Sequence, residues 1–124
     1  MQSYVNKITA AATATGLFQL VDDAIFDENE KYPALIVGDR TAQCDGIEIA
    51  NRVYNEAWVY EVFVMTKKAN GWTDLENLSS SFLKELLNGE FRLISQHHSE
   101  VLISGRDVLV NSMRIEALAR GAYV

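Results

Sequence analysis

The clearest periodic pattern in the chain lies between Thr73 and Asn88, where apolar side chains recur every three or four residues. This spacing places them on one face of an α-helix. Thr73 and Glu76 have the spacing of a capping box, and Gly89 stands where a helix commonly ends. The pattern predicts an amphipathic helix that packs on a sheet. Its apolar face consists of Leu75, Leu78, Phe82, Leu83, Leu86 and Leu87.

The stretch EAWVYEVFVMT, within a strand expected over residues 52–67, is apolar on both of its faces. At about 3.3 Å per residue this strand would be about 50 Å long, more than a core of this size covers. We therefore expect part of it to project or bend. One face should take the helix over residues 73–88, and the other should be covered by the first helix, a second sheet or another subunit. The first face carries Trp58, Tyr60, Val62 and Val64, and the second carries Ala57, Val59, Phe63 and Met65.

Weaker patterns predict the elements that precede this strand. Residues 3–15 read as a first helix that ends at Gly16, and residues 18–26 and 34–38 read as strands. The polar stretch 39–51 contains the turn signal Asp45-Gly46. Ile47 and Ile49 alternate with polar residues, so part of this stretch could extend the long strand as a hairpin arm.

The last third of the chain predicts strands over residues 90–96, 99–105 and 106–121, with a turn near SQHHSE. In the last strand, Leu109, Met113, Ile115 and Ala117 share one face, opposite Ser112, Arg114 and Glu116. The order α-β-β-β-α-β-β predicts a single α+β domain over residues 1–124. Two helices would pack on a sheet dominated by antiparallel strands, and an arm at about residues 41–56 would protrude.

Composition and charge narrow the function classes. Apolar residues make up 48% of the chain and charged residues 23%, as in ordinary globular proteins. A net charge of −6 argues against a surface that grips nucleic acid, since phosphate binding needs clustered Lys and Arg. No apolar run is long enough to span a membrane. The start of the chain, with only Lys7, lacks the pattern of a signal peptide, so we expect an intracellular protein.

Residues with reactive side chains form no catalytic or metal-binding pattern. Cys44 is the only cysteine and is expected as a partly buried residue in a loop. His97 and His98 are adjacent, so on a strand they would point to opposite faces; near a turn we expect them to be solvated. Asp22-Asp23 and the acidic run 27–30 do not have the spacing of a calcium loop. We therefore predict no catalytic residue, no metal site and no cofactor.

Several segments follow one another in an order that resembles a known family. They are YPALIVGDR, WVYEVFVMT, TDLENLSSSFLKELL and VLISGRDVLVNSMRIEALAR, after a helix rich in Thr and Ala. This order resembles the tail terminator (tail completion) proteins of long-tailed bacteriophages and prophages. The resemblance covers most of the chain as a pattern and includes no invariant motif.

The resemblance implies a small α+β subunit that closes into a hexameric ring. The ring would cap the finished tail tube, stop its polymerisation and face the neck or head-completion protein. Genome DNA would pass through the lumen without specific binding, in a virion assembled in the host cytoplasm. The resemblance implies no catalytic residues and no membrane. Subunit contacts would fall on the long strand and its arm, at Ile47, Ile49, Val53, Tyr54, Trp58 and Tyr60.

Other hypotheses stay open. The aromatic residues Trp58, Tyr60, Trp72 and Tyr123 are expected first in core and sheet packing, with a subunit interface as the alternative, which the two apolar faces of the long strand favour for Trp58 and Tyr60. The chain could be a neighbouring neck or head–tail joining subunit. It could instead be a small enzyme or ligand-binding homodimer with a pocket under the helix, using His97 or His98 with Asp22 or Asp23. An antitoxin-like partner binder is a further possibility.

Overall fold

The structure, a computed structural model, describes the backbone of residues 2–22, 31–48, 53–87 and 90–122. Side chains are described in these ranges except at residues 2–3, 41–57 and 118–122. The elements are α1 (Gln2–Thr15), β1 (Leu20–Asp22), β2 (Ala34–Glu48), β3 (Val53–Lys67), the short 3₁₀ helix η1 (Lys68–Asn70), α2 (Gly71–Leu86), β4 (Phe91–Ile103) and β5 (Arg106–Ala122).

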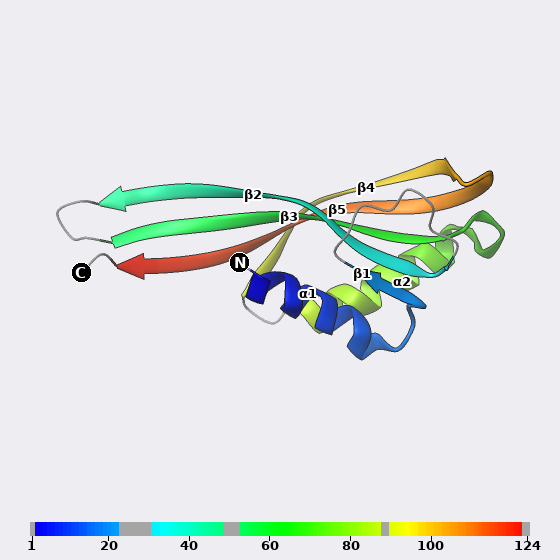
Figure 1. Ribbon diagram of the computed structural model, residues 1–124, viewed down its shortest axis with the longest axis horizontal. Coiled ribbons are helices and arrows are strands. Elements are labelled where there is room, and N and C mark those ends of the chain that lie inside the picture. Colours follow the sequence, from blue (N-terminus) through cyan, green and yellow to red (C-terminus); the bar gives the residue numbers. More distant parts are fainter. Residues whose placement is uncertain (1, 23–30, 49–52, 88–89, 123–124) are drawn as a thin grey trace.

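The strands form one mixed sheet in the order β1-β2-β3-β5-β4. Only the short β1–β2 pair is parallel; β2–β3, β3–β5 and β4–β5 are antiparallel. Figure 1 shows the two helices together on one side of the sheet. The predicted class, a single α+β domain with a largely antiparallel sheet and two helices, is therefore confirmed.

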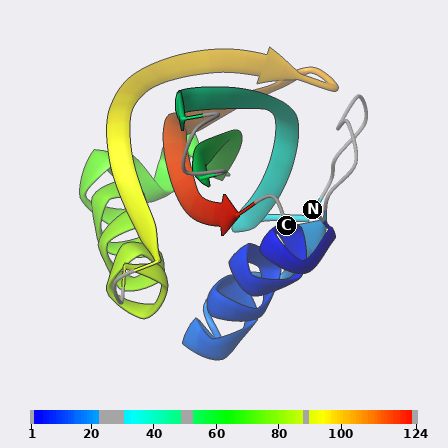
Figure 2. The ribbon, with the colours of Figure 1, turned by 90° about the vertical axis from the view of Figure 1, so that its left-hand side faces the viewer.

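The main core lies between this helical pair and the sheet. The apolar stripe of α2 and one face of α1 meet the face of β3 that carries Tyr60. Figure 2, a view along the length of the molecule, shows both helices beneath the curved sheet. The predicted inner face of β5 is confirmed, and so is the predicted face of α2 except at Leu87, which follows the last residue of the helix and is exposed. Fully buried members of this core include Val5, Ile8, Leu35, Tyr60, Leu75, Phe82, Leu109, Met113 and Ile115.

The opposite face of the sheet carries a second, smaller apolar cluster. It includes Met65 and Phe63 of β3, so both faces of this strand do contact apolar side chains. The first helix does not cover this face, because α1 packs beside α2. The remaining members are Leu20, Tyr32, Ala34, Ile36, Ile103, Val108 and Val110.

Three predicted element boundaries were wrong. The first strand begins at Leu20 rather than at Phe18, and its predicted end at Phe26 lies outside the described residues. β2 does not stop at Gly38 but continues to Glu48, and Asp45-Gly46 lies at a register shift within it rather than at a turn. β4 runs without interruption through SQHHSE. For β2 and β4, pairing with a long neighbouring strand outweighs the local polar sequence.

The predicted capping box was also wrong. α2 begins at Gly71, two residues before Thr73, and its N-cap residue Asn70 makes no side-chain capping hydrogen bond. The start of the helix is instead linked to the end of β3 by side-chain hydrogen bonds. The hydroxyl of Thr66, fully buried, donates to Asp74 Oδ2 at 2.8 Å and accepts from Asn70 Nδ2 at 3.1 Å.

Replacement of Thr66 by valine tests the contribution of these hydrogen bonds to stability. The change keeps the shape of the side chain but removes the hydroxyl that joins Asp74 and Asn70. We expect a loss of about 1–2 kcal/mol in the free energy of unfolding, measured by urea denaturation. Thr73→Ala is the matched control: it should cost well under the ~1 kcal/mol of a lost cap, because Thr73 lies inside the helix. A larger loss for Thr73→Ala than for Thr66→Val would contradict this assignment.

Gly38 allows the ring of Phe63 to cross β2. A Cβ atom at Gly38 would lie 2.7 Å from Phe63 Cε2, closer than non-bonded carbons approach. We therefore expect Gly38→Ala to lower the free energy of unfolding by about 1–3 kcal/mol. In the Phe63→Ala background the same change should cost much less, so a double-mutant cycle by urea denaturation should give a clear coupling energy. Equal costs in both backgrounds would show that the ring is not the obstacle.

Candidate assembly surfaces

Three strands continue beyond the helices as an extension of the sheet. We define the extension as residues 41–48 of β2, 53–57 of β3 and 118–122 of β5, which are joined by antiparallel pairing with one register shift, between Asp45 and Glu48. Figure 1 shows these strands reaching well past α1 and α2. The arm expected at about residues 41–56 is thus a hairpin to which β5 adds a third strand.

Both outer edges of the extension lack a neighbouring strand among the described residues. β1 pairs only with Ala34–Ile36 of β2, far from the extension. On the other side, the pairing of β4 with β5 begins at Phe91 and Ala117, just before the extension starts. Open edges present backbone N–H and C=O groups that another strand can pair with. The extension can therefore add a strand of another chain on either side.

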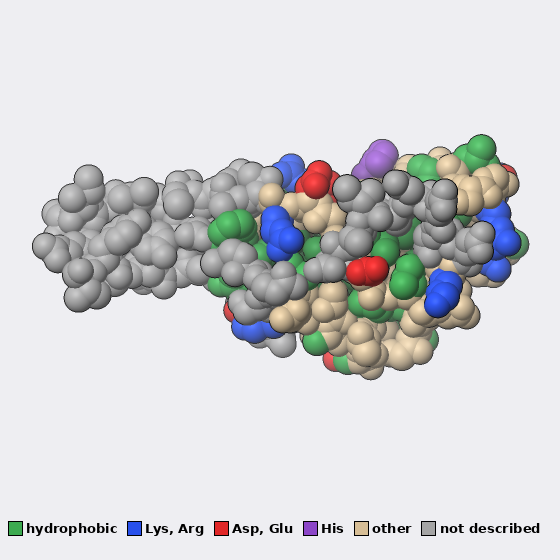
Figure 3. Space-filling view, viewed as in Figure 1, with side chains coloured by type: hydrophobic (Ala, Val, Ile, Leu, Met, Phe, Trp, Pro, Cys, Tyr) green, Lys and Arg blue, Asp and Glu red, His purple; other side chains and the backbone are tan. Residues whose placement is uncertain are grey.

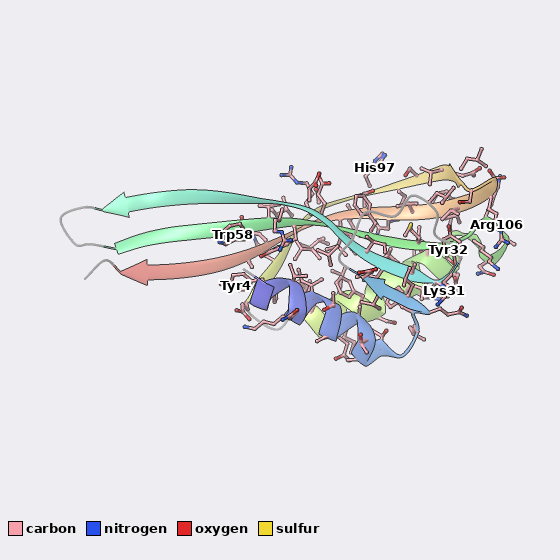
Figure 4. All side chains as sticks on the ribbon, viewed as in Figure 1. Tyr4, Lys31, Tyr32, Trp58, His97 and Arg106 are labelled. Carbon is pink, nitrogen blue, oxygen red and sulfur yellow. The ribbon has the colours of Figure 1, made fainter. Side chains whose placement is uncertain are left out.

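An aromatic cluster supports the base of the extension. The buried ring of Tyr60 packs edge-on to Tyr4 of α1, with ring centroids 6.4 Å apart, and Tyr4 packs in the same way on Phe91. Burial raises the pKa of Tyr60, partly opposed by the nearby Arg40. Figure 4 shows Tyr4 and Trp58 at this junction. The first helix therefore fixes the point from which the strands project.

The structure separates the predicted contact residues into three groups. Tyr60 has no exposed surface, so the expectation that its side chain contacts another subunit was wrong; it belongs to the core of its own chain. Trp58 is half-buried against the same core. Ile47, Val53 and Tyr54 lie in the strands of the extension, where side chains are not described, and Ile49 lies outside the described residues.

A second exposed surface lies at the far end of the molecule. The hairpin between β4 and β5 turns through Ser104 and Gly105, both with positive φ, and leaves Leu102 70% exposed. Figure 3 shows basic and apolar side chains together at this end, where Figure 4 places Arg106. The sequence analysis did not identify this surface. It expected one strand to end and the next to begin here, but not the exposure of the apolar residues.

The predicted histidine–aspartate site is not assembled. His98 stacks on Trp72 of α2, with ring centroids 6.0 Å apart, while His97 lines a hollow on the opposite face of β4. The two side chains do point to opposite faces, as expected, but from a strand rather than a turn. Asp22 lies in β1, at the other edge of the sheet, and Asp23 lies outside the described residues. Cys44 belongs to β2 and not to a loop.

Three shallow hollows of about 260–400 Å³ lie around the sheet. One separates α2 from β4, one lies beside the Lys7–Glu90 ion pair, and one lies on the opposite face near His97. Among the described residues, no group of three or more His, Cys, Asp or Glu side chains could hold a metal ion. None of the described helices has the length and apolar character needed to cross a membrane.

Comparisons with known proteins add little to this geometry. No protein-family model matches the chain, and no curated protein matches it. Among solved structures, the chain is similar to the type 4 fimbrial biogenesis protein PilO from Pseudomonas aeruginosa, with a TM-score of 0.46 and 11% sequence identity. That alignment covers 98% of this chain and 70% of the other. A likeness at this level carries no conclusion about function.

Proposed function

We propose that this protein is a structural subunit that assembles with copies of itself into a ring and serves as the tail terminator of a long-tailed bacteriophage. The observation that carries the proposal is the three-stranded extension, whose two outer edges are open. The extension projects beyond the two helices that cover the main core. It would let each subunit contact the next one.

Closed rings arise when a surface on one subunit binds a different surface on its neighbour and the rotation closes. The extension and the body of the subunit are two such different surfaces. Tyr4 of α1 packs on Tyr60 and Phe91 at the base of the extension, so the extension leaves the body of the subunit from a supported position, which a repeated contact between subunits requires. The hexameric number comes from the sequence resemblance alone.

The resemblance also supplies the partners. The ring would cap the tail tube protein on one side and contact a neck or head-completion protein on the other. The hairpin end around Leu102, remote from the extension, is suited to one of these contacts because exposed apolar side chains favour protein interfaces. The net charge of −6 suits a lumen through which DNA slides without being held.

A neighbouring neck or head–tail joining subunit would use the same surfaces and is the closest alternative. The alternative of an enzyme that uses His97 or His98 with Asp22 loses support, because these residues lie at opposite edges of the sheet. A ligand-binding homodimer would have a fixed small mass at all concentrations.

The test is the absolute mass of the purified protein by light scattering across a concentration series, together with negative-stain images. The proposal expects a mass of about six times the 13.9 kDa of one chain, or a monomer that converts to rings as concentration rises. Addition of purified tail tubes should place these rings at tube ends. A dimer at every concentration, with no rings in the images, would contradict the proposed ring. Rings that bind only head or neck particles would favour the joining subunit.

A further inference from the structure

The outer edge of β4 is long, open and accessible. β4 is the last strand of the sheet and pairs only with β5 among the described residues. It spans 13 residues, more than twice the usual strand length of about 5–6 residues. Figure 2 shows it along the outside of the curved sheet. Every side chain from Ile94 to Leu102 except Ser99 is exposed, so another chain can approach this edge from either face of the sheet.

Features that normally keep an edge strand from pairing with another chain are scarce on β4. Such features include lysine, proline, unpaired charge and bulges. The sequence FRLISQHHSEVLI contains no lysine or proline, and its one register shift lies near its start. Its two formal charges are neutralised within the chain, because Arg92 is paired with Glu116 at 2.7 Å and Glu100 with Lys68 at 3.2 Å. β4 is therefore open to pairing along most of its length.

Exposed apolar side chains also gather along β4. Among the described residues, six large apolar side chains are exposed, and three of them, Ile94, Val101 and Leu102, belong to this strand. A fourth, Trp72, stacks on His98 of the same strand. A long, open edge with exposed apolar side chains favours the addition of a strand from another chain. β4 therefore has the features of an acceptor for such a strand.

The extension supplies a strand whose charge fits this acceptor. Residues 41–48 of β2 contain Asp45 and Glu48 and no Lys or Arg. Two copies of this strand would bring like charges side by side, which disfavours pairing of β2 with itself. β4 offers no unpaired acidic residue, because its one glutamate is already in an ion pair. Residues 41–48 also provide a longer edge than residues 118–122 of β5, on the other side of the extension.

We propose that residues 93–100 of β4 pair with residues 41–48 of β2 in the next copy, so that the sheets of two neighbouring subunits become continuous. The inference rests on the proposed ring and names the surface of the body that receives the extension. Full overlap would form about eight backbone hydrogen bonds, since paired strands average about one bond per residue pair. Donor and acceptor are different edges, so each subunit uses one of each and the contact can repeat around a ring. The end of β4 at Leu102 stays free for the contact with a tube or neck protein.

The experiment is disulfide cross-linking of the full chain, whose only native cysteine, Cys44, lies within residues 41–48. Full overlap places Cys44 opposite His97 if the two strands are antiparallel, and opposite Gln96 if they are parallel. Directly opposite Cα atoms lie about 4.5–5.5 Å apart, within the range that a disulfide spans. A second cysteine is therefore placed singly at each of positions 95–98, and copper phenanthroline is added as the oxidant. We expect at least one variant to give covalent species larger than a dimer, up to the full ring, on a non-reducing gel.

Lys84→Cys, at an exposed position of α2, is the matched control and should give no species larger than a dimer. Light scattering of the same samples before oxidation separates this inference from the ring itself. Rings that yield no larger species from any of the four variants would overturn the pairing and leave the ring standing, whereas absence of rings would overturn both. Dimers that persist when Cys44→Ser is combined with a cysteine on β4 would show that two β4 edges pair with each other, which also overturns the proposal.

A lysine at Ile94 tests the same edge without oxidation. Ile94 is 44% exposed, and Leu17, which precedes β1 at the other edge of the sheet, is 46% exposed. Ile94→Lys should raise the protein concentration at which half of the chains are assembled at least about tenfold, because a charge on an edge strand opposes strand addition. Leu17→Lys adds the same charge and should leave this concentration unchanged. Circular dichroism should show both variants folded, and equal effects of the two substitutions would overturn the proposal.

Discussion

Removal of the extension is expected to convert the assembled protein into a folded monomer. The design replaces Cys44–Glu56 with Asn-Gly and ends the chain after Leu118. Gln43 and Ala57 are paired across β2 and β3, and Ala57 is paired with Leu118, so a two-residue turn can close the shortened hairpin. Light scattering should give the mass of one shortened chain at every concentration at which the full chain forms rings.

The shortened chain keeps every described residue of the main core, which lies between the helices and the body of the sheet. Circular dichroism and a cooperative urea transition therefore serve as its folding control. A second control substitutes a lysine at Leu102, at the opposite end of the molecule, and should leave the ring intact while weakening attachment to tubes. A shortened chain that still forms rings would show that the extension is not the subunit contact.

The largest stability effect is expected from Phe82→Ala. Phe82 is fully buried on α2 at the centre of the main core. Truncation removes the apolar contacts of the ring and leaves a cavity between helix and sheet, which costs about 3–5 kcal/mol. Urea denaturation of the shortened monomer gives this value without the contribution of assembly.

Glu85→Ala is the matched control for that change, since it lies on the exposed side of the same helix. It should change the free energy of unfolding by less than about 0.5 kcal/mol. If Phe82→Ala lowers the free energy of unfolding by less than about 1 kcal/mol, α2 does not cover the main core as described.

Local sequence patterns were sufficient for the elements whose periodicity is strong. The apolar stripe that includes Leu78 and Phe82 predicted α2, and alternation around Met113 predicted the inner face of β5. The two apolar faces of β3 also followed from simple alternation. In these cases the side chains that form the pattern are those that make the contacts.

Features that depend on long-range pairing could not be predicted in this way. The second half of β2 is polar and contains Asp45-Gly46, yet it is a strand because β3 lies beside it. The hydrogen bonds of the buried Asn111 depend on a β4–β5 register that brings Gln96 within reach, and on the position of Ser79 on α2. A single asparagine in an alternating strand gives no local signal of this arrangement.

The position of β5 between β3 and β4 also determines when the subunit can be completed. Its pairing partners on β3 precede it by between 41 residues (Lys67 and Val108) and 69 residues (Val53 and Ala122). Contacts this distant in the chain form slowly. Until they form, β3 has no neighbour on that side, and the extension consists of two strands rather than three. During synthesis on the ribosome, an unfinished chain therefore lacks the mature extension, so the proposed ring would take up only chains whose last strand has been inserted.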